Sequence, residues 1–161
     1  MKQDFQIGNS FDSQTVSLGH AKKVWRRIDE QLPGGYHITN MSEFASAGLI
    51  QAGMAVVKDT ASGADIRDVK VLTWARLKAG ASADGGIDSH GSIIGFTQED
   101  VPVYQHGTGA SATYNYGTCN IIVKGEIYGY MLGETVADAA TISAAVKDMT
   151  QKNGLSIRVI D

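Results

Sequence analysis

The sequence predicts a mainly β protein of the α+β class. We expect a compact β barrel or sandwich with one late helix, preceded by an N-terminal arm that contains a short amphipathic helix. Glycine occurs 19 times and proline only twice, which fits short strands joined by tight turns. Several segments rich in β-branched and aromatic residues lie between clusters of Gly, Asp, Asn and Ser. One late segment, residues 136–152, instead repeats its small and apolar residues every three to four positions.

The first 35 residues differ from the rest of the chain. Residues 1–16 show no periodicity, and Phe5, Ile7 and Phe11 are separated by polar residues and glycine, as in an extended arm. A Pro-Gly-Gly break then follows at residues 33–35. These features predict two parts, which are an N-terminal docking arm (1–35) and a β-rich body (36–161).

The arm is predicted to contain a short amphipathic helix over residues 18–30, with Ser17 as its N-cap. One side of this helix is apolar and is formed by Leu18, Ala21, Trp25 and Ile28. The other side is basic and is formed by Lys22, Lys23, Arg26 and Arg27. Three interpretations of the basic side stay open, namely a solvated surface, docking on an acidic protein, and contact with a membrane or nucleic acid. Trp25 favours docking, because Trp and Arg are typical of protein interfaces.

The body is predicted to consist mostly of strands. The expected strands are residues 54–59, 68–77, 92–97, 101–106 and 113–132. Pro102 places its strand at an edge or at a strand start. Residues 136–152 form the late helix, which Asn153 and Gly154 end, and residues 155–160 form a last strand.

Composition excludes several classes of function. A net charge of −3 gives the chain no nucleic-acid footprint, and no apolar run reaches membrane-spanning length. The first ten residues lack the apolar core of a signal peptide, so synthesis in a cytoplasm is the default expectation. The single cysteine, Cys119, lies in an apparent strand and is expected to be a buried apolar residue. The four histidines lack metal-binding spacing, so no cofactor or metal is predicted.

Two motif-like segments do not support the ligands that they suggest. Residues 107–112 match the G-x-G-x-x-A dinucleotide fingerprint, but a β-branched and aromatic segment follows where the fingerprint needs a helix. A hairpin loop is therefore predicted there. Asp88 and Glu99 stand at the first and last positions of a calcium loop, but Ile93 replaces the glycine that shapes the turn. A small enzyme remains the third interpretation of function, provided that Glu99, Asp100 and Glu126 converge in the fold.

Tyrosines provide a second candidate site. Tyr114 and Tyr116, and likewise Tyr128 and Tyr130, are spaced so that each pair shares one face of a strand. Such rings could form a sugar-stacking surface. Cross-strand packing on the half-exposed side of a sheet explains the same pattern, and both interpretations stay open.

The chain resembles head-fibre and capsid decoration proteins of tailed bacteriophages. The resemblance lies in the arm FQIGNSFDSQTVSLGHAKKVWRRID, in AGLIQAGMAVVKD (residues 47–59) and in IIVKGEIY (residues 121–128). It implies a protein that binds the outer face of the head, often as a trimer, with its N-terminal segment on the major capsid protein. Carried over, residues 5–28 are the docking arm. The long shaft and tip of a full head fibre are missing, which favours a short decoration or fibre-base protein.

We therefore expect a structural virion protein and not an enzyme. It is expected to be made in the host cytoplasm and located on the capsid surface. Its expected partners are the major capsid protein and two further copies of itself, with no nucleic acid or membrane. The alternative is a carbohydrate-binding β module that uses the tyrosines.

Overall fold

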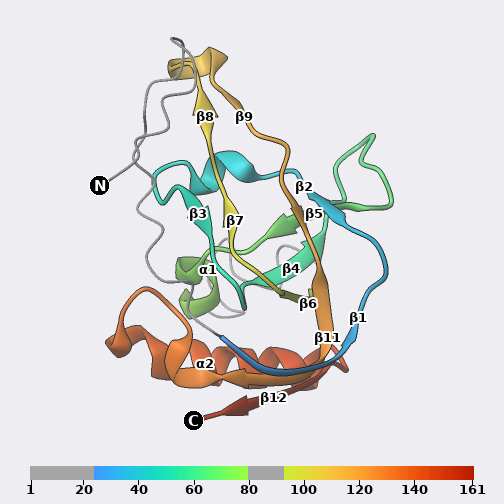
Figure 1. The fold of residues 1–161 in the computed structure, drawn as a ribbon, viewed down its shortest axis with the longest axis vertical. Helices are drawn as coiled ribbons and strands as arrows, with labels where there is room; N and C mark the ends of the chain where they lie inside the picture. The colour runs from blue at the N-terminus through green and yellow to red at the C-terminus, as the bar shows by residue number, and fades with distance from the viewer. Residues whose placement is uncertain (1–23, 80–92) are drawn as a thin grey trace, which may run out of the picture.

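The computed structural model describes residues 24–79 and 93–161, and they form a mainly β fold with one long, late helix. The predicted fold class is confirmed for these residues. The main sheet has eight strands, which are β1 (Trp25–Gln31), β2 (Tyr36–Ile38), β4 (Ala55–Lys58), β5 (Asp68–Val71), β6 (Ile93–Thr97), β10 (Thr118–Cys119), β11 (Ile121–Tyr128) and β12 (Ser156–Ile160). Figure 1 shows how they wrap around the core.

The main sheet is strongly curled. Its strands follow the order β1-β11-β6-β4-β5-β2-β10, and β12 pairs in parallel with β11. Asn120 alone separates β10 from β11. The order of paired strands from β11 through β6, β4, β5 and β2 thus ends at β10, which is the strand directly before β11 in the chain. This return to the same stretch of chain gives the sheet its barrel-like shape.

Short elements decorate this sheet. They are the two-stranded pairs β3 (Leu49–Ile50) with β7 (Val101–Pro102) and β8 (Gln105–His106) with β9 (Thr113–Tyr114), the helices α1 (Trp74–Ala79) and α2 (Val136–Lys152), and the 3-10 turns η1 (Met41–Phe44), η3 (Gly109–Ser111) and η4 (Gly129–Met131). Pro102 lies in a two-stranded sheet, in agreement with the predicted edge position. Residues 107–112 lie in the β8–β9 hairpin, as predicted, and do not begin an α-helix.

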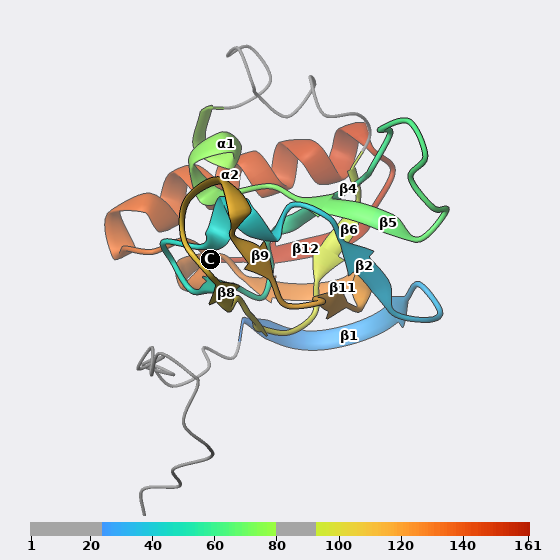
Figure 2. The same ribbon diagram turned by 90° about the horizontal axis from the view of Figure 1, so that it is seen from above.

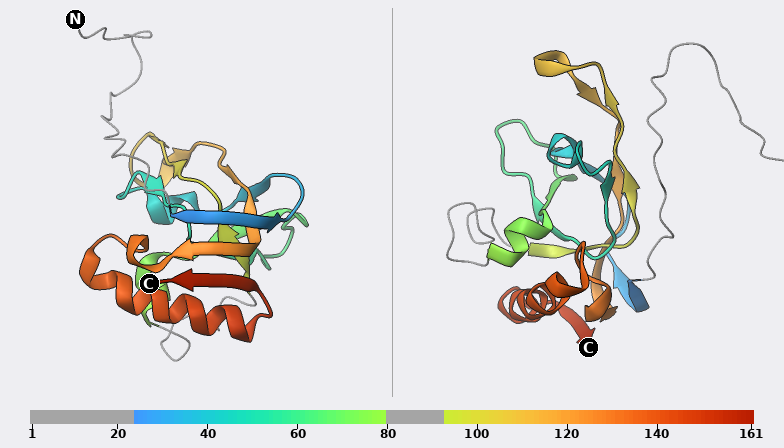
Figure 3. Two further views of the ribbon diagram at one scale, coloured as in Figure 1. Left: turned by 60° about the horizontal axis from the view of Figure 1, so that its bottom comes forward. Right: turned by 90° about the vertical axis from the view of Figure 1, so that its left-hand side faces the viewer.

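The elements divide between two ends of the molecule. The β8–β9 hairpin projects from one end of the long axis, and α2 lies with β12 at the other end (Figures 1 and 3). Seen from above, α1 and α2 lie at one side of the molecule and strand β1 lies at the opposite side (Figure 2). The β8–β9 hairpin and the end formed by α2 and β12 are therefore far apart.

Helix α2 follows the sequence prediction closely. The Thr135 side chain accepts a hydrogen bond from the backbone N–H of Asp138 and caps the first turn. Gly154, with φ of +66°, follows the last turn and lets the chain reverse into β12. The buried side of α2 consists of Ala139, Ile142, Ser143, Val146 and Met149.

The helix predicted over residues 18–30 is wrong where the structure describes it, because residues 25–31 form strand β1. Residues 18–23 lie outside the described residues. A β-bulge in β1 explains why the apolar residues of this segment have the spacing of a helix. Trp25 pairs with Ile127 and Ile28 with Gly125, with a register shift between them, so these two apolar residues share a face at a spacing of three. That spacing is also the spacing of a helix.

The predicted boundary after residue 35 is also wrong. Strand β1 pairs with β11 along its length, and Val24 and Trp25 belong to the same buried cluster as the rest of the body. Residues 33–35 are thus a turn inside the sheet, between β1 and β2. The described part of the chain provides no domain boundary there.

The strand predicted over residues 68–77 is shorter than expected. Strand β5 ends at Val71, and α1 begins at Trp74. The Thr73 hydroxyl accepts a hydrogen bond from the backbone N–H of Arg76 at 3.4 Å, which caps the start of α1. The helix that this hydrogen bond caps begins inside the predicted strand, so the strand is shorter.

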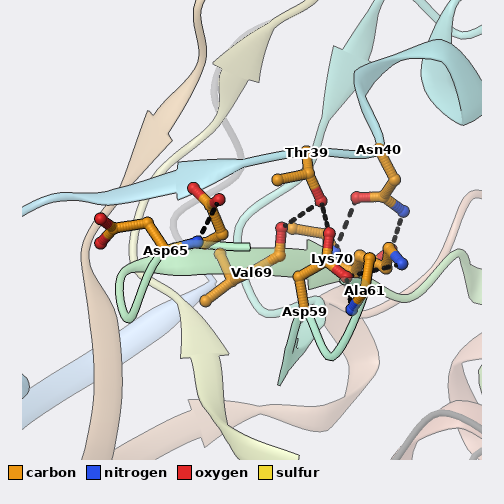
Figure 4. A network of polar contacts seen from close by, with 9 residues as sticks. Thr39, Asn40, Asp59, Ala61, Asp65, Val69 and Lys70 are labelled. Carbon is orange, nitrogen blue, oxygen red and sulfur yellow. Dashed lines mark hydrogen bonds and ion pairs between the residues drawn. The ribbon is translucent and has the colours of Figure 1, made fainter. Parts of the chain in front are cut away.

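A buried carboxylate ties the strands on the far side of the sheet together (Figure 4). The Asp59 side chain is only 6% exposed and lies 2.8 Å from Lys70 Nζ. It also accepts hydrogen bonds from the Thr39 hydroxyl at 2.6 Å and from the Ala61 backbone N–H at 2.9 Å. Burial by itself raises the pKa of Asp59, but these donors outweigh burial and lower the pKa to about 2.

This network predicts a specific acid sensitivity. Because the folded pKa of Asp59 lies below its ordinary value of 3.8, its contribution to stability is complete above that value and is lost as the pH falls towards 2. Asp59→Asn should cost about 2 kcal/mol at neutral pH and flatten the acid-induced fall in stability. Urea unfolding between neutral and acid pH measures both effects. Asp148→Asn, on the exposed side of α2, is the control, and an equal acid response in both variants would contradict the assignment.

The crowded position of Gly125 predicts that a larger residue there lowers stability. A Cβ atom on this residue would lie 2.5 Å from the backbone oxygen of Arg27, because the β1 bulge passes directly over it. Gly125→Ala should therefore force β1 away from β11 and cost about 1–3 kcal/mol in urea unfolding. Gly35→Ala is the matched control, since its Cβ would meet Thr118 Cβ at an ordinary 3.7 Å. Equal stability of the two variants would show that β1 does not need this close approach.

Candidate docking surface

The outward side of β1, β11 and β12 carries a cluster of arginines. Arg27, Glu126 and Arg158 lie directly opposite one another on these three neighbouring strands. Arg26 comes from the β1 bulge and also faces Glu126. We call this surface the arginine face and define it as Arg26, Arg27, Glu126, Tyr128 and Arg158.

Glu126 organises the arginine face. Its side chain is only 11% exposed, whereas those of Arg26 and Arg158 are 55% and 78% exposed. The shortest distances from its carboxylate are 3.5 Å to Arg26 and 3.8 Å to both Arg27 and Arg158. A buried carboxylate needs such positive charge around it. These distances are longer than hydrogen bonds, so the guanidinium groups are held mainly by charge.

The three arginines are not equivalent. Arg27 also binds Asp29, at 2.9 Å from its Nε and 3.1 Å from its second terminal nitrogen. The side chains of Arg26 and Arg158 form no hydrogen bond with the described residues. Their planar donor groups therefore remain available to a carboxylate or carbonyl group of another molecule.

Aromatic rings extend the arginine face. Tyr128 lies two residues after Glu126 on β11 and so points to the same side. Its ring lies 5.3 Å from that of Tyr130, which is exposed on η4. Arg and Tyr are the residue types that most often dominate binding energy in protein interfaces.

Trp25 does not belong to any docking surface, which corrects the sequence prediction. It is 6% exposed, and its indole N–H donates to the backbone oxygen of Thr97 at 3.0 Å. The strand pairing of β1 turns this ring towards the core. The apolar partner that Trp25 requires is thus the protein's own interior.

The other predicted docking residues divide into two groups. Arg26, Arg27 and Ile28 are exposed on β1, although Ile28 points to the side opposite Arg27. The remaining ones lie outside the described residues, and they are Phe5, Ile7, Phe11, Leu18 and Lys22.

The predicted tyrosine surface is divided between two places. Tyr128 and Tyr130 contact each other beside the arginine face. Tyr116 instead stacks on His37, with ring centroids 4.2 Å apart and planes 6° from parallel, and Tyr114 packs partly against the core. Strand β11 lies between the two groups, so the four rings do not form one platform.

The carboxylates considered for catalysis have separate partners. Glu126 is surrounded by arginines, while Asp100 accepts the Ala52 backbone N–H at 2.8 Å. Glu99 accepts a hydrogen bond from Asn120 at 3.4 Å. Cys119 is buried as predicted, and burial, with a smaller effect of nearby Glu99, raises the pKa of its thiol to about 12.

Three residues of the arginine face are not predicted as docking residues from sequence, namely Glu126, Arg158 and Tyr128, and Tyr128 is expected only as a sugar-stacking residue. Arg158 lies in a short alternating strand, where an exposed arginine is ordinary. Glu126 was considered only as an acid. The parallel pairing of β11 with β12 brings them together, and no local pattern indicates that register.

Comparisons with protein-family models, with curated proteins and with solved structures find no match. Within residues 24–79 and 93–161, no three His, Cys, Asp or Glu side chains gather closely enough to hold a metal ion. The described helices include none that is long and apolar enough to cross a membrane.

The geometry predicts that Glu126 keeps the arginine face together. Glu126→Gln removes the charge that offsets three guanidinium groups, so their mutual repulsion should lower stability by about 1 kcal/mol at low salt. High salt should reduce this loss. Urea unfolding at two salt concentrations measures it, with Glu30→Gln on exposed β1 as control. Salt-independent stability equal to that of the unchanged protein would contradict the role of Glu126.

Proposed function

We propose that this chain is a structural assembly protein that docks through its arginine face. In its specific form, the proposal is a decoration or head-fibre-base protein on the outer surface of a tailed-phage capsid. The observation that carries the docking role is the pair Arg26 and Arg158, which are exposed beside a buried carboxylate and keep unused donors. The identity of the shell rests on the resemblance in the arm and in residues 47–59 and 121–128.

The arginine face suits an acidic partner surface. Its guanidinium groups are fixed near Glu126 before binding, so less side-chain freedom is lost when they meet a carboxylate. Arginine also pairs with carboxylates through two parallel hydrogen bonds, which adds orientation. Positive charge at the rim of the contact speeds association and makes it sensitive to salt.

The first residue that the structure describes, Val24, lies beside this face. The backbone N–H of Tyr128 donates to the backbone oxygen of Val24 at 2.9 Å, so Val24 lies next to Tyr128. Residues 1–23 carry the apolar residues that the resemblance assigns to docking on the major capsid protein. If the arm and the arginine face bind the same partner, they would act together. Linking two binding elements in one chain strengthens attachment through effective concentration.

The proposed mechanism is mechanical. Each docked copy buries area between capsid subunits and neutralises charge there, which holds the shell against internal pressure. The proposal includes a homotrimer, which would present three arginine faces at once. It gives the chain no catalytic role, cofactor, membrane or nucleic-acid partner.

Carbohydrate binding is the second candidate function, and one observation favours it. Tyr116 is 74% exposed and lies parallel to His37, whose Nδ1 is 2.9 Å from Asp68. One face of the Tyr116 ring is therefore supported, and its other face is open for stacking on a sugar ring. Glycan binding that survives removal of residues 1–23 and disappears in Tyr116→Ala would favour this function over capsid docking.

The docking proposal predicts the effect of a double substitution. Arg26→Gln with Arg158→Gln should weaken binding to heads of the phage that encodes the chain by about tenfold or more and flatten its salt dependence. Co-sedimentation of the full chain with heads stripped of it, at several salt concentrations, measures both.

The control is Lys58→Gln with Arg67→Gln, which removes the same charge from exposed positions outside the arginine face. Thermal unfolding checks that all variants fold. Equal loss of binding in the control pair would show that the change in net charge, and not the arginine face, causes the loss. Failure of the unchanged protein to bind heads at all would overturn the capsid function itself.

A further inference from the structure

A long segment without Asp, Glu, Lys or Arg forms a projection from the described part of the molecule. Between Asp100 and Lys124 the sequence contains no Asp, Glu, Lys or Arg. The middle of this segment folds into strands β8 and β9 with the turn η3 between them, and it extends away from the body (Figure 3). We call residues 104–116 the neutral hairpin.

The neutral hairpin is mostly exposed. Tyr104, Tyr116, Thr113 and all of residues 106–111 are exposed. Across the whole chain 19% of residues are charged, and charged side chains normally gather on such projecting loops. Interface centres show the opposite composition, since they are depleted of charge and enriched in tyrosine. The neutral hairpin has the composition of an interface and the exposure of a free loop.

The base of the neutral hairpin is firmly held by Asn115. The Asn115 side chain accepts the Tyr104 N–H at 2.8 Å and donates to the Pro102 oxygen at 2.9 Å, and its backbone N–H donates to the Tyr104 oxygen at 3.1 Å. These contacts fix the direction in which the hairpin leaves the body. A partner would therefore meet a surface that is already oriented.

The outer part of the neutral hairpin is bonded mainly to itself. Its strands pair at only two positions, Gln105 with Tyr114 and His106 with Thr113. Beyond them, Ser111 donates to the Thr108 oxygen at 3.4 Å and Ala112 to the Gly109 oxygen at 3.2 Å. A two-stranded hairpin is marginally stable by itself, whereas added strands or a covering surface stabilise it. Contact with another molecule would thus stabilise the hairpin.

The chemistry of the hairpin selects its partner. A charged surface placed against it would lose hydration without gaining an opposite charge, which is unfavourable. The partner surface must therefore be uncharged and polar to apolar. The same hairpin of another copy meets this condition by construction. Three hairpins gathered around a threefold axis would give the homotrimer proposed above.

We propose that the neutral hairpin binds the neutral hairpin of a second copy of this chain. This inference deepens the proposed self-association and rests on it, but it does not depend on capsid binding. The neutral hairpin and the α2–β12 end lie at opposite ends of the long axis, so the contact leaves the arginine face open (Figure 1). Self-association and docking would then use two surfaces of different chemistry.

Charge introduced into the hairpin tests the proposal. Thr108→Glu with Ala110→Glu places two like charges on exposed positions of each tip, where copies would repel one another. Light scattering of the full chain should give about three times 17.1 kDa for the unchanged protein and 17.1 kDa for this variant. The control is Ala140→Glu with Ala144→Glu on the exposed side of α2, which should keep the larger mass.

A charge-swap mixture identifies the surface that the hairpin meets. Thr108→Lys with Ala110→Lys should also stay at 17.1 kDa alone, and mixing it with the Glu variant should restore the larger mass. Circular dichroism melting confirms that both variants fold. The proposal is overturned if the unchanged protein remains at 17.1 kDa, if the Glu variant keeps the larger mass, or if the mixture stays monomeric. Head binding by the same samples reports separately on the docking function.

Discussion

The fold depends on strand β11 and on the pairs that it makes on both of its edges. It pairs with β1 along one edge, and with β6 and then β12 along the other. Through Asn120 it also continues from β10, which closes the curl of the sheet against β2. Gly125 makes this crowding feasible, because it lets the bulged backbone of β1 pass where a side chain would collide. Loss of this strand would separate the helical end from the rest of the sheet.

The same pairing creates the proposed binding surface. One side of β1 places Trp25 in the core, and the other side places Arg27 beside Glu126. The proposed binding and the stability of the fold would therefore be coupled at the arginine face, because Glu126 would serve both. The neutral hairpin is different, since its exposed tip contributes nothing to the buried core. Changes there would alter the proposed self-association and leave the fold intact.

Much of the architecture could be predicted from local pattern. Helix α2 has the predicted bounds, the last strand follows it, and the glycine-rich segment 107–112 lies in a hairpin. In each case a cap, a glycine or a clear period lies within a few residues of the element that it specifies. The helix over residues 18–30 is wrong at its described end because a β-bulge spaces Trp25 and Ile28 as a helix does. The candidate site was predicted only in part, through Arg26 and Arg27 as docking residues and Tyr128 as a sugar-stacking residue.

By itself the sequence determined the fold class, the late helix, the buried cysteine and the uncharged segment between Asp100 and Lys124. These features depend on composition and on neighbours in the chain. Only the tertiary structure decided that Trp25 lies inside, that Arg158 joins Arg26 and Arg27 around Glu126, and that the uncharged segment projects as a hairpin. Those outcomes depend on which distant strands pair and in which register, and a strand's own residues specify its faces but not its partner.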